Sequence, residues 1–155
     1  MATETTTQLK VYVFIGEPDD FKKLRHAALW FETGDDLTSF LIHVTKLQAT
    51  ESTPTAYRAF YHVDVNRSFN PLRSLKIVGS VNLGPLEKQI TSTQLADFLS
   101  ETPVDNSDPE FNCQVWVQGA LQRLKDKGYL SEEQYEKGFD GMIKFVSEAT
   151  DEPNR

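Results

Sequence analysis

The spacing of apolar residues changes once along this chain, at about residue 91, from the period of strands to that of helices. Before that point, alternating runs rich in β-branched and aromatic residues predict strands near 9–15, 25–32, 37–48, 55–65 and 74–84. After it, helical spacing predicts helices near 93–101, 113–127 and 132–149. Strands followed by helices predict an α+β fold, in which an antiparallel sheet of about five strands packs on helices.

The length and composition favour one globular domain. The chain has 155 residues, of which 39% are hydrophobic and 25% are charged, as is usual for a domain with a buried core. The Thr-rich segment 1–7 predicts a disordered leader, residues 8–149 predict the domain, and residues 150–155 predict a tail. The sequence shows no internal repeat that would indicate another architecture.

The charge and the apolar runs exclude several kinds of partner. The net charge is −7 and the Lys and Arg residues are scattered, so no surface for nucleic acid is expected. The first residues lack the basic and apolar regions of a secretory signal, and no apolar run reaches the roughly 18 residues of a membrane span. We therefore expect a cytoplasmic protein without a membrane span. The apolar stripe of the last helix predicts either core packing or the face of a homo-oligomer.

The only cysteine, Cys113, follows Asn112 at the start of a predicted helix. Asparagine is a preferred N-cap residue, so Cys113 is expected to be the first residue of the helix, facing the sheet. Unpaired backbone N–H groups and the helix dipole stabilise a thiolate at that position. One cysteine excludes an internal disulfide and a thiolate-rich zinc site, and we expect a free thiol and no cofactor.

The three histidines, His26, His43 and His62, all lie in predicted strands. A turn predicted at residues 33–36 joins the strands of His26 and His43 as an antiparallel hairpin, which makes the two rings candidate cross-strand neighbours. Together with Cys113 they predict a catalytic set, in which one imidazole is the base and the other orients it. The strand register decides whether the rings share a face, and the sequence leaves it open.

These residues predict a cysteine-dependent hydrolase or an acyl/amidotransferase. Such an enzyme forms a thioester with a small amide, ester or peptide substrate and passes the acyl group to water or an amine. The side chains expected to bind this small-molecule or peptide substrate are Trp30, Trp116, Tyr12 and Gln114.

Two alternatives stay open. A cysteine on the apolar face of a helix is often a small core residue, and the chain is then a non-catalytic protein that binds a small ligand or peptide. Its cleft would be lined by Trp30, Trp116, Tyr61 and the histidines. The other alternative is a metal site formed by His26, His43 and Cys113, although their separations carry no ligand-spacing signature.

The segments RHAALWFE, IHV and FNCQVWV, in this order, resemble circularly permuted papain-like enzymes of the NlpC/P60 superfamily. Examples are the lecithin:retinol acyltransferase-like and PPPDE-peptidase families, in which histidine precedes cysteine and the nucleophile lies in an Asn-Cys pair at a helix N-terminus. The resemblance covers about residues 9–127 and implies Cys113 as nucleophile, His26 as base and His43 as the orienting residue. The whole sequence also resembles a group of small uncharacterised proteins of filamentous fungi with an Asn-Cys-Gln-x-Trp-Val motif.

The chain departs from both families close to the two motifs. The acyltransferase-like motif continues with Glu-His-Phe after the cysteine, where this chain has Gln114, Val115 and Trp116. The PPPDE group has a glycine or small residue with a polar neighbour after its histidine, where this chain has Ala27 and Ala28. The resemblance therefore implies a nucleophile and its histidines but no class of substrate.

Overall fold

The computed structural model describes residues 7–16, 20–33, 38–46, 61–74, 76–108 and 110–149. The strands are β1 (Gln8–Phe14), β2 (His26–Glu32), β3 (Phe40–Lys46), β4 (Tyr61–Asn66) and β5 (Ile77–Pro85). The helices are α1 (Ser92–Ser100), α2 (Cys113–Asp126) and α3 (Glu132–Ser147), with short 3-10 turns η1 (Lys22–Leu24) and η2 (Pro71–Arg73). The strands form one antiparallel sheet in the order β4-β3-β2-β1-β5.

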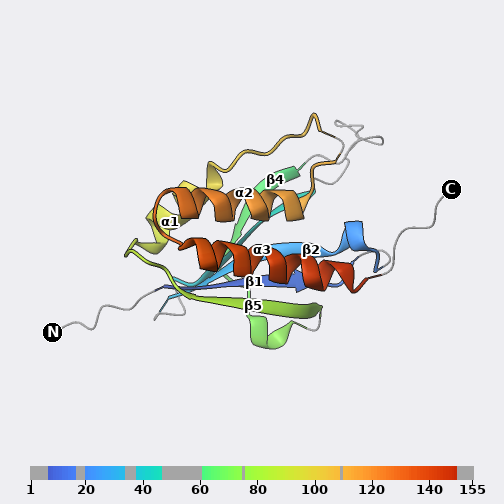
Figure 1. Cartoon of the computed structure of the whole chain (residues 1–155), viewed down its shortest axis with the longest axis horizontal. Helices are drawn as coiled ribbons and strands as arrows, with labels where there is room; N and C mark the ends of the chain where they lie inside the picture. The colour runs from blue at the N-terminus through green and yellow to red at the C-terminus, as the bar shows by residue number, and fades with distance from the viewer. Residues whose placement is uncertain are drawn as a thin grey trace.

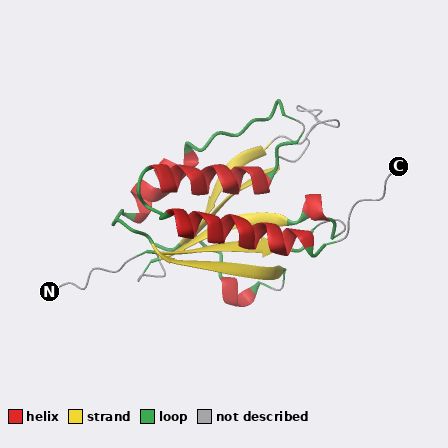
Figure 2. Ribbon diagram, in the orientation of Figure 1, coloured by secondary structure: helices red, strands yellow, loops and turns green. Residues whose placement is uncertain are grey.

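The two long helices lie side by side across one face of the sheet (Figure 1), with α2 over β2 and β3 and α3 over β1 and β5. Figure 2 shows the same division, with helices α2 and α3 in front of the strands. This arrangement confirms the α+β class and the antiparallel sheet packed on helices. None of the helices in the described part of the chain has the length and apolar character needed to cross a bilayer.

Several predicted segments are only partly visible. Residues 34–36 of the predicted turn, residues 1–6 of the leader, the tail 150–155 and the first part of the strand predicted at 55–65 lie outside the described residues. The antiparallel pairing of β2 with β3 is nevertheless direct, because Trp30 lies opposite Leu41 and Phe31 opposite Phe40. The predicted pairing of these two strands is therefore confirmed.

The main core lies between the sheet and the helices. Alternate residues of each strand point toward α2 and α3, as the two-residue period of a strand requires. On α2 the buried side chains are Cys113, Trp116, Val117, Ala120, Leu121 and Leu124, which is the stripe expected from helical spacing. At 25 cal/mol per Å² of apolar surface, each large side chain of this kind contributes about 1.5–3 kcal/mol when it is fully buried.

The opposite face of the sheet carries a second, smaller apolar cluster. Tyr12, Trp30 and Leu41 are each at most 6% exposed, and Phe69 from the loop after β4 packs against them. The rings of Trp30 and Phe69 meet edge to face, with centroids 5.7 Å apart. The loop that carries Phe69 therefore covers this cluster, which lies on the face of the sheet opposite the long helices.

The sheet opens at one end between β2 and β3. The paired positions of these strands in the described residues run from Leu29–Ile42 to Phe31–Phe40. Beyond this short ladder, β2 continues along β1, where His26 lies opposite Phe14, and β3 continues along β4. The N-terminus of α2 lies at this opening, because the Sγ atom of Cys113 accepts a hydrogen bond from the Ala27 backbone N–H.

Candidate active site

Cys113 is placed by a capped helix start. The Asn112 side chain accepts hydrogen bonds from the backbone N–H groups of Gln114 and Val115, at 3.0 and 3.1 Å. Cys113 is therefore the first residue of α2, as predicted from the preference of asparagine for the N-cap. The residue is only 7% exposed, and it lines a cavity at the open end of the sheet.

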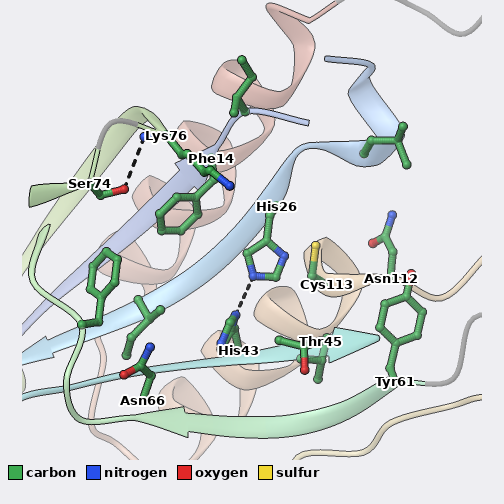
Figure 3. Close-up of a pocket in the computed structure, with 15 residues that line it drawn as sticks. Phe14, His26, His43, Thr45, Tyr61, Asn66, Ser74, Lys76, Asn112 and Cys113 are labelled. Carbon is green, nitrogen blue, oxygen red and sulfur yellow. Dashed lines mark hydrogen bonds between the residues drawn. The ribbon is translucent and has the colours of Figure 1, made fainter. Parts of the chain in front are cut away.

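The thiol lies against the backbone on both sides of His26. Its sulfur accepts from the Ala27 N–H at 3.5 Å and donates to the Arg25 carbonyl at 3.8 Å. Figure 3 shows the His26 ring and Cys113 side by side, with the Nδ1 edge of the ring turned toward the cysteine. The helix start and the strand start thus bring a thiol and an imidazole together from positions 87 residues apart.

The chain just before His26 is held from two directions. The side-chain amide of Gln114 donates to the carbonyls of Lys22 and Arg25, each at 2.9 Å. The Arg25 guanidinium, 7% exposed, pairs with Asp20 at 2.8 Å and donates to the carbonyl of Phe145 in α3. The hydrogen bond from Arg25 lowers the pKa of Asp20 to about 2, so this carboxylate is ionised at neutral pH. These contacts fix where β2 begins and therefore where the His26 ring points.

His26 and His43 are hydrogen-bonded to each other. The Nε2 atom of His26 lies 2.6 Å from Nδ1 of His43, and the two rings meet edge to face (Figure 3). Burial, with a smaller contribution from His43, lowers the pKa of His26 to about 3. The His26 ring is therefore neutral at neutral pH, so one of its nitrogens is available as a base.

His43 makes a second contact, on the outer side. Its Nε2 atom lies 3.1 Å from Oδ2 of Asp64, the residue directly opposite it on β4. Burial lowers the pKa of His43, and this outweighs the opposing effect of the Asp64 carboxylate. Cys113, His26, His43 and Asp64 thus form a row that crosses from α2 through β2 and β3 to β4.

The cavity at this end of the sheet has a volume of about 650 Å³. Tyr61, at the start of β4, contributes a phenol whose pKa is raised by burial and by the charge of a Cys113 thiolate. The hydroxyl of Tyr61 is consequently protonated at neutral pH and is a hydrogen-bond donor. The other side chains that line the cavity are Phe14, Ile15, Leu24, Leu41, Val44, Thr45, Asn66, Phe69, Ser74, Lys76 and Asn112.

The seven predicted site residues divide into two groups. Cys113, His26 and His43 line the cavity together, and the register that the sequence left open puts the two imidazoles in contact. The four predicted substrate-binding residues lie elsewhere: Trp116 is in the main core and 1% exposed, Trp30 and Tyr12 are in the second cluster, and Gln114 holds the backbone before His26.

Physical reasons explain these four positions. Trp116 is three residues beyond Cys113, nearly one helical turn, so it shares the buried stripe but lies deeper under the helix. Trp30 and Tyr12 point to the face opposite the helices and are covered by Phe69. Gln114 lies within reach of two carbonyls that need donors, since the chain turns there from η1 into β2.

Asp64 is not among the site residues predicted from the sequence. Tyr61 was predicted only as part of a ligand-binding cleft and not as a catalytic residue. The signal for Asp64 is the alternation His62-Val63-Asp64, which places its carboxylate on the same face as His62 if the segment is a strand. Its partner His43 becomes visible only with the register of β3 and β4. Among the described residues, no group of three or more His, Cys, Asp or Glu side chains has an arrangement that holds a metal ion.

The fold and the site define an α+β protein in which the only cysteine shares a cavity with the two histidines of a hydrogen-bonded His-His-Asp row. The chain belongs to a family of unknown function (DUF6540), which matches residues 13–131. The matched segment contains all four residues of the row. No curated protein and no solved structure gave a significant match to the chain.

Proposed function

We propose that this protein is a cysteine-dependent hydrolase or acyl/amidotransferase, related to the circularly permuted papain-like enzymes, that acts through a thioester. The observation that carries the proposal is the thiol of Cys113 at a capped helix start, beside a neutral imidazole whose other nitrogen is hydrogen-bonded to a second imidazole. A nucleophile, a base and an orienting group in this order are the parts that thiol catalysis requires. We place it in the reducing cytoplasm, where a free thiol persists.

In the first half of the reaction, the Cys113 sulfur attacks the carbonyl carbon of an amide, ester or peptide substrate. The thiol proton passes to Nδ1 of His26 as the C–S bond forms and the carbonyl π electrons move to oxygen. Collapse of this intermediate breaks the bond to the amine or alcohol, which leaves with the proton from His26. The product of this half-reaction is a thioester on Cys113.

In the second half, water or an amine attacks the thioester and gives its proton to His26. Collapse breaks the C–S bond, and the sulfur takes the proton back, so the enzyme returns to its starting state. The oxyanion of both intermediates needs hydrogen-bond donors. Tyr61 supports this role because it lines the same cavity and its raised pKa keeps the hydroxyl protonated.

The test is the detection of the thioester. Wild-type protein is incubated with p-nitrophenyl esters of increasing acyl length, quenched in acid, and weighed intact by mass spectrometry. We expect one acyl adduct on the wild type, and its absence from a Cys113→Ala variant assigns it to the only cysteine in the sequence. Cys113→Ala should give no adduct while its circular dichroism spectrum is unchanged. Equal release of nitrophenolate by both proteins, with no adduct on either, would overturn the proposal.

A non-catalytic role as a small-ligand or peptide binder is the second candidate. It is favoured by the aromatic and aliphatic part of the cavity, where Phe14, Phe69 and Leu41 converge. The same ester panel, and a panel of short peptides, separates the two functions when binding is followed by amide shifts in NMR spectra. Identical shifts in wild type and Cys113→Ala, with no turnover, would identify a binding protein.

A further inference from the structure

Asp64 lies at the outer end of the row of side chains that starts at Cys113, and hydrogen bonds join this row from His26 through His43 to Asp64. It is directly opposite His43 in the β3–β4 ladder, and its Oδ2 atom is 3.1 Å from the His43 Nε2 atom. The Asp64 side chain is 45% exposed, whereas that of His43 is only 13% exposed. Asp64 therefore contacts the largely buried His43 ring from the solvent side and does not line the cavity itself.

The number of protons in the row restricts their positions. A neutral imidazole carries one N–H, and an ionised carboxylate only accepts hydrogen bonds. Since burial keeps His43 neutral at neutral pH, its contact with Asp64 is a hydrogen bond only if the proton is on Nε2. The Nδ1 atom of His43 is then an acceptor.

The same reasoning extends to His26. Its Nε2 atom faces the Nδ1 atom of His43 at 2.6 Å, so an accepting Nδ1 requires His26 to donate from Nε2. The neutral His26 ring then has no proton on Nδ1, the edge that faces Cys113 in Figure 3. The lone pair needed to accept the thiol proton is on the correct atom only in this tautomer.

We propose that Asp64 is a positioning residue that, through His43, selects the tautomer of His26 in which Nδ1 is the base for Cys113. The inference rests on the proposed function, because it assigns Asp64 to the same thiol chemistry. Asp64 does not touch the reacting atoms, and it acts by accepting one hydrogen bond. The order of donors is therefore His26 to His43 and His43 to Asp64.

A neighbouring pair provides a matched control. His62 lies two residues before Asp64 on β4, and its Nε2 atom is 3.0 Å from the hydroxyl of Thr45 on β3. Like Asp64, it is on β4 and makes a polar contact with β3. It bonds to Thr45, however, and not to either imidazole of the row. Phe14 and Cys113 face the ring of His26, and Asp64 faces the ring of His43. His62 acts on His43 only through its charge when it is protonated.

The experiment records ring ¹⁵N spectra of protein with labelled histidine at pH 7. We expect His26 and His43 of the wild type to be single Nε2–H tautomers. In Asp64→Ala both rings should become tautomer mixtures, and the rate of Cys113 alkylation by iodoacetamide at pH 6 to 7 should fall about tenfold. Asp64→Asn should keep both rings in the Nε2–H form, because its amide oxygen still accepts from Nε2–H. Its alkylation rate should be within about threefold of the wild-type rate. His62→Gln should leave them unchanged.

Two results would overturn the inference. One is a wild-type spectrum in which His43 carries its proton on Nδ1, a result that needs no variant to fold. The other is an Asp64→Ala spectrum with both rings still on Nε2–H and an unchanged alkylation rate. The ring spectra are independent of turnover, so failure to detect a thioester would remove the proposed function without deciding the tautomers. A thioester with unaltered tautomers in Asp64→Ala would remove only the role of Asp64.

Discussion

The two faces of the sheet differ although the same strands build both. On β3, Ile42 and Val44 belong to the main core and are at most 1% exposed, although Val44 also borders the cavity. His43 and Thr45 point the other way and line the cavity. On β2, Ala27 and Leu29 are in the main core and His26 is in the polar row. The helix-covered face is apolar throughout, and the other face changes from an aromatic cluster to titratable groups toward the open end.

The two faces of the sheet meet different requirements, since one provides stability and the other holds the polar groups near Cys113. The helix-covered face supplies the apolar burial that offsets the loss of chain entropy. A polar atom buried there without a partner is costly, and among the described residues Trp116 Nε1 is such an atom. The opposite face carries groups that are costly to bury, each held by a hydrogen bond to the next strand. Substitutions on the first face should therefore change stability, and substitutions on the second should change the reactivity of Cys113.

The largest effect is expected from Ile42→Ala, on the helix-covered face. Ile42 is fully buried, so removal of its side chain should lower the free energy of unfolding by about 3 kcal/mol, measured in urea. In the absence of urea, the alkylation rate of Cys113 should stay within about twofold of wild type, because Ile42 does not line the cavity. A collapse of reactivity in a protein that is still folded would contradict the division between the faces.

His26→Gln on the opposite face should have the reverse pattern. Loss of the base should lower the rate of Cys113 alkylation at pH 6 by about 100-fold, while the stability in urea at pH 7 changes by less than about 1 kcal/mol. The wild-type thiol should stay reactive at pH 6, because the neutral imidazole of His26 accepts its proton. The rate of the variant should instead depend only on the ionisation of the thiol, and so rise steeply with pH. An unchanged pH profile would show that His26 is not the base.

The pH dependence of stability should come from the opposite face. The pKa of His26 is lowered from about 6.5 in an unfolded chain to about 3, so the unfolded state binds more protons at mildly acid pH. Stability should therefore rise by about 2 kcal/mol from pH 5 to pH 7, and His43 should add to it in the same direction.

Urea titrations at several pH values measure this dependence. The pKa of Asp20, lowered to about 2, contributes only at lower pH, since its unfolded pKa is near 3.8. His26→Gln should remove most of the rise between pH 5 and 7. An equal rise in this variant would assign the effect to other groups.

The smallest effect is expected from Tyr61→Phe. The rate of thioester formation from an activated ester should fall about tenfold, since one donor to the oxyanion is lost. Alkylation by iodoacetamide forms no oxyanion, and its rate should change by less than about twofold. Tyr135→Phe, a tyrosine on α3 that does not line the cavity, is the control. Equal losses in both reactions would indicate that Tyr61 acts by packing on Phe111, which its ring contacts edge to face.

Features set by near neighbours in the chain were predictable. The alternation of apolar residues predicted the strands, and helical spacing predicted the buried stripe of α2. The Asn112 cap was predictable because capping uses groups within three residues of each other. The candidate nucleophile and its two histidines followed from residue type and chain order, and the structure brings these three together.

The positions of the other site residues depend on contacts between distant segments. Trp30 and Tyr12 were predicted to bind substrate, but the loop that carries Phe69 covers them. Asp64 has no local signal that distinguishes it from any other acidic residue on a strand. Its importance in the structure comes from lying opposite His43, a relation that no short stretch of sequence contains.

The sequence by itself determined the classes of element, the helix start at Cys113 and the residues from which a thiol site is assembled. Only the tertiary structure decided that the β2–β3 ladder stops at Leu29 and Ile42, so that the start of α2 reaches the start of β2. Register also decided that His26, His43 and Asp64 face one another. The physical reason is that a one-residue shift between strands reverses the face of every side chain, and pairing across the whole sheet selects the register.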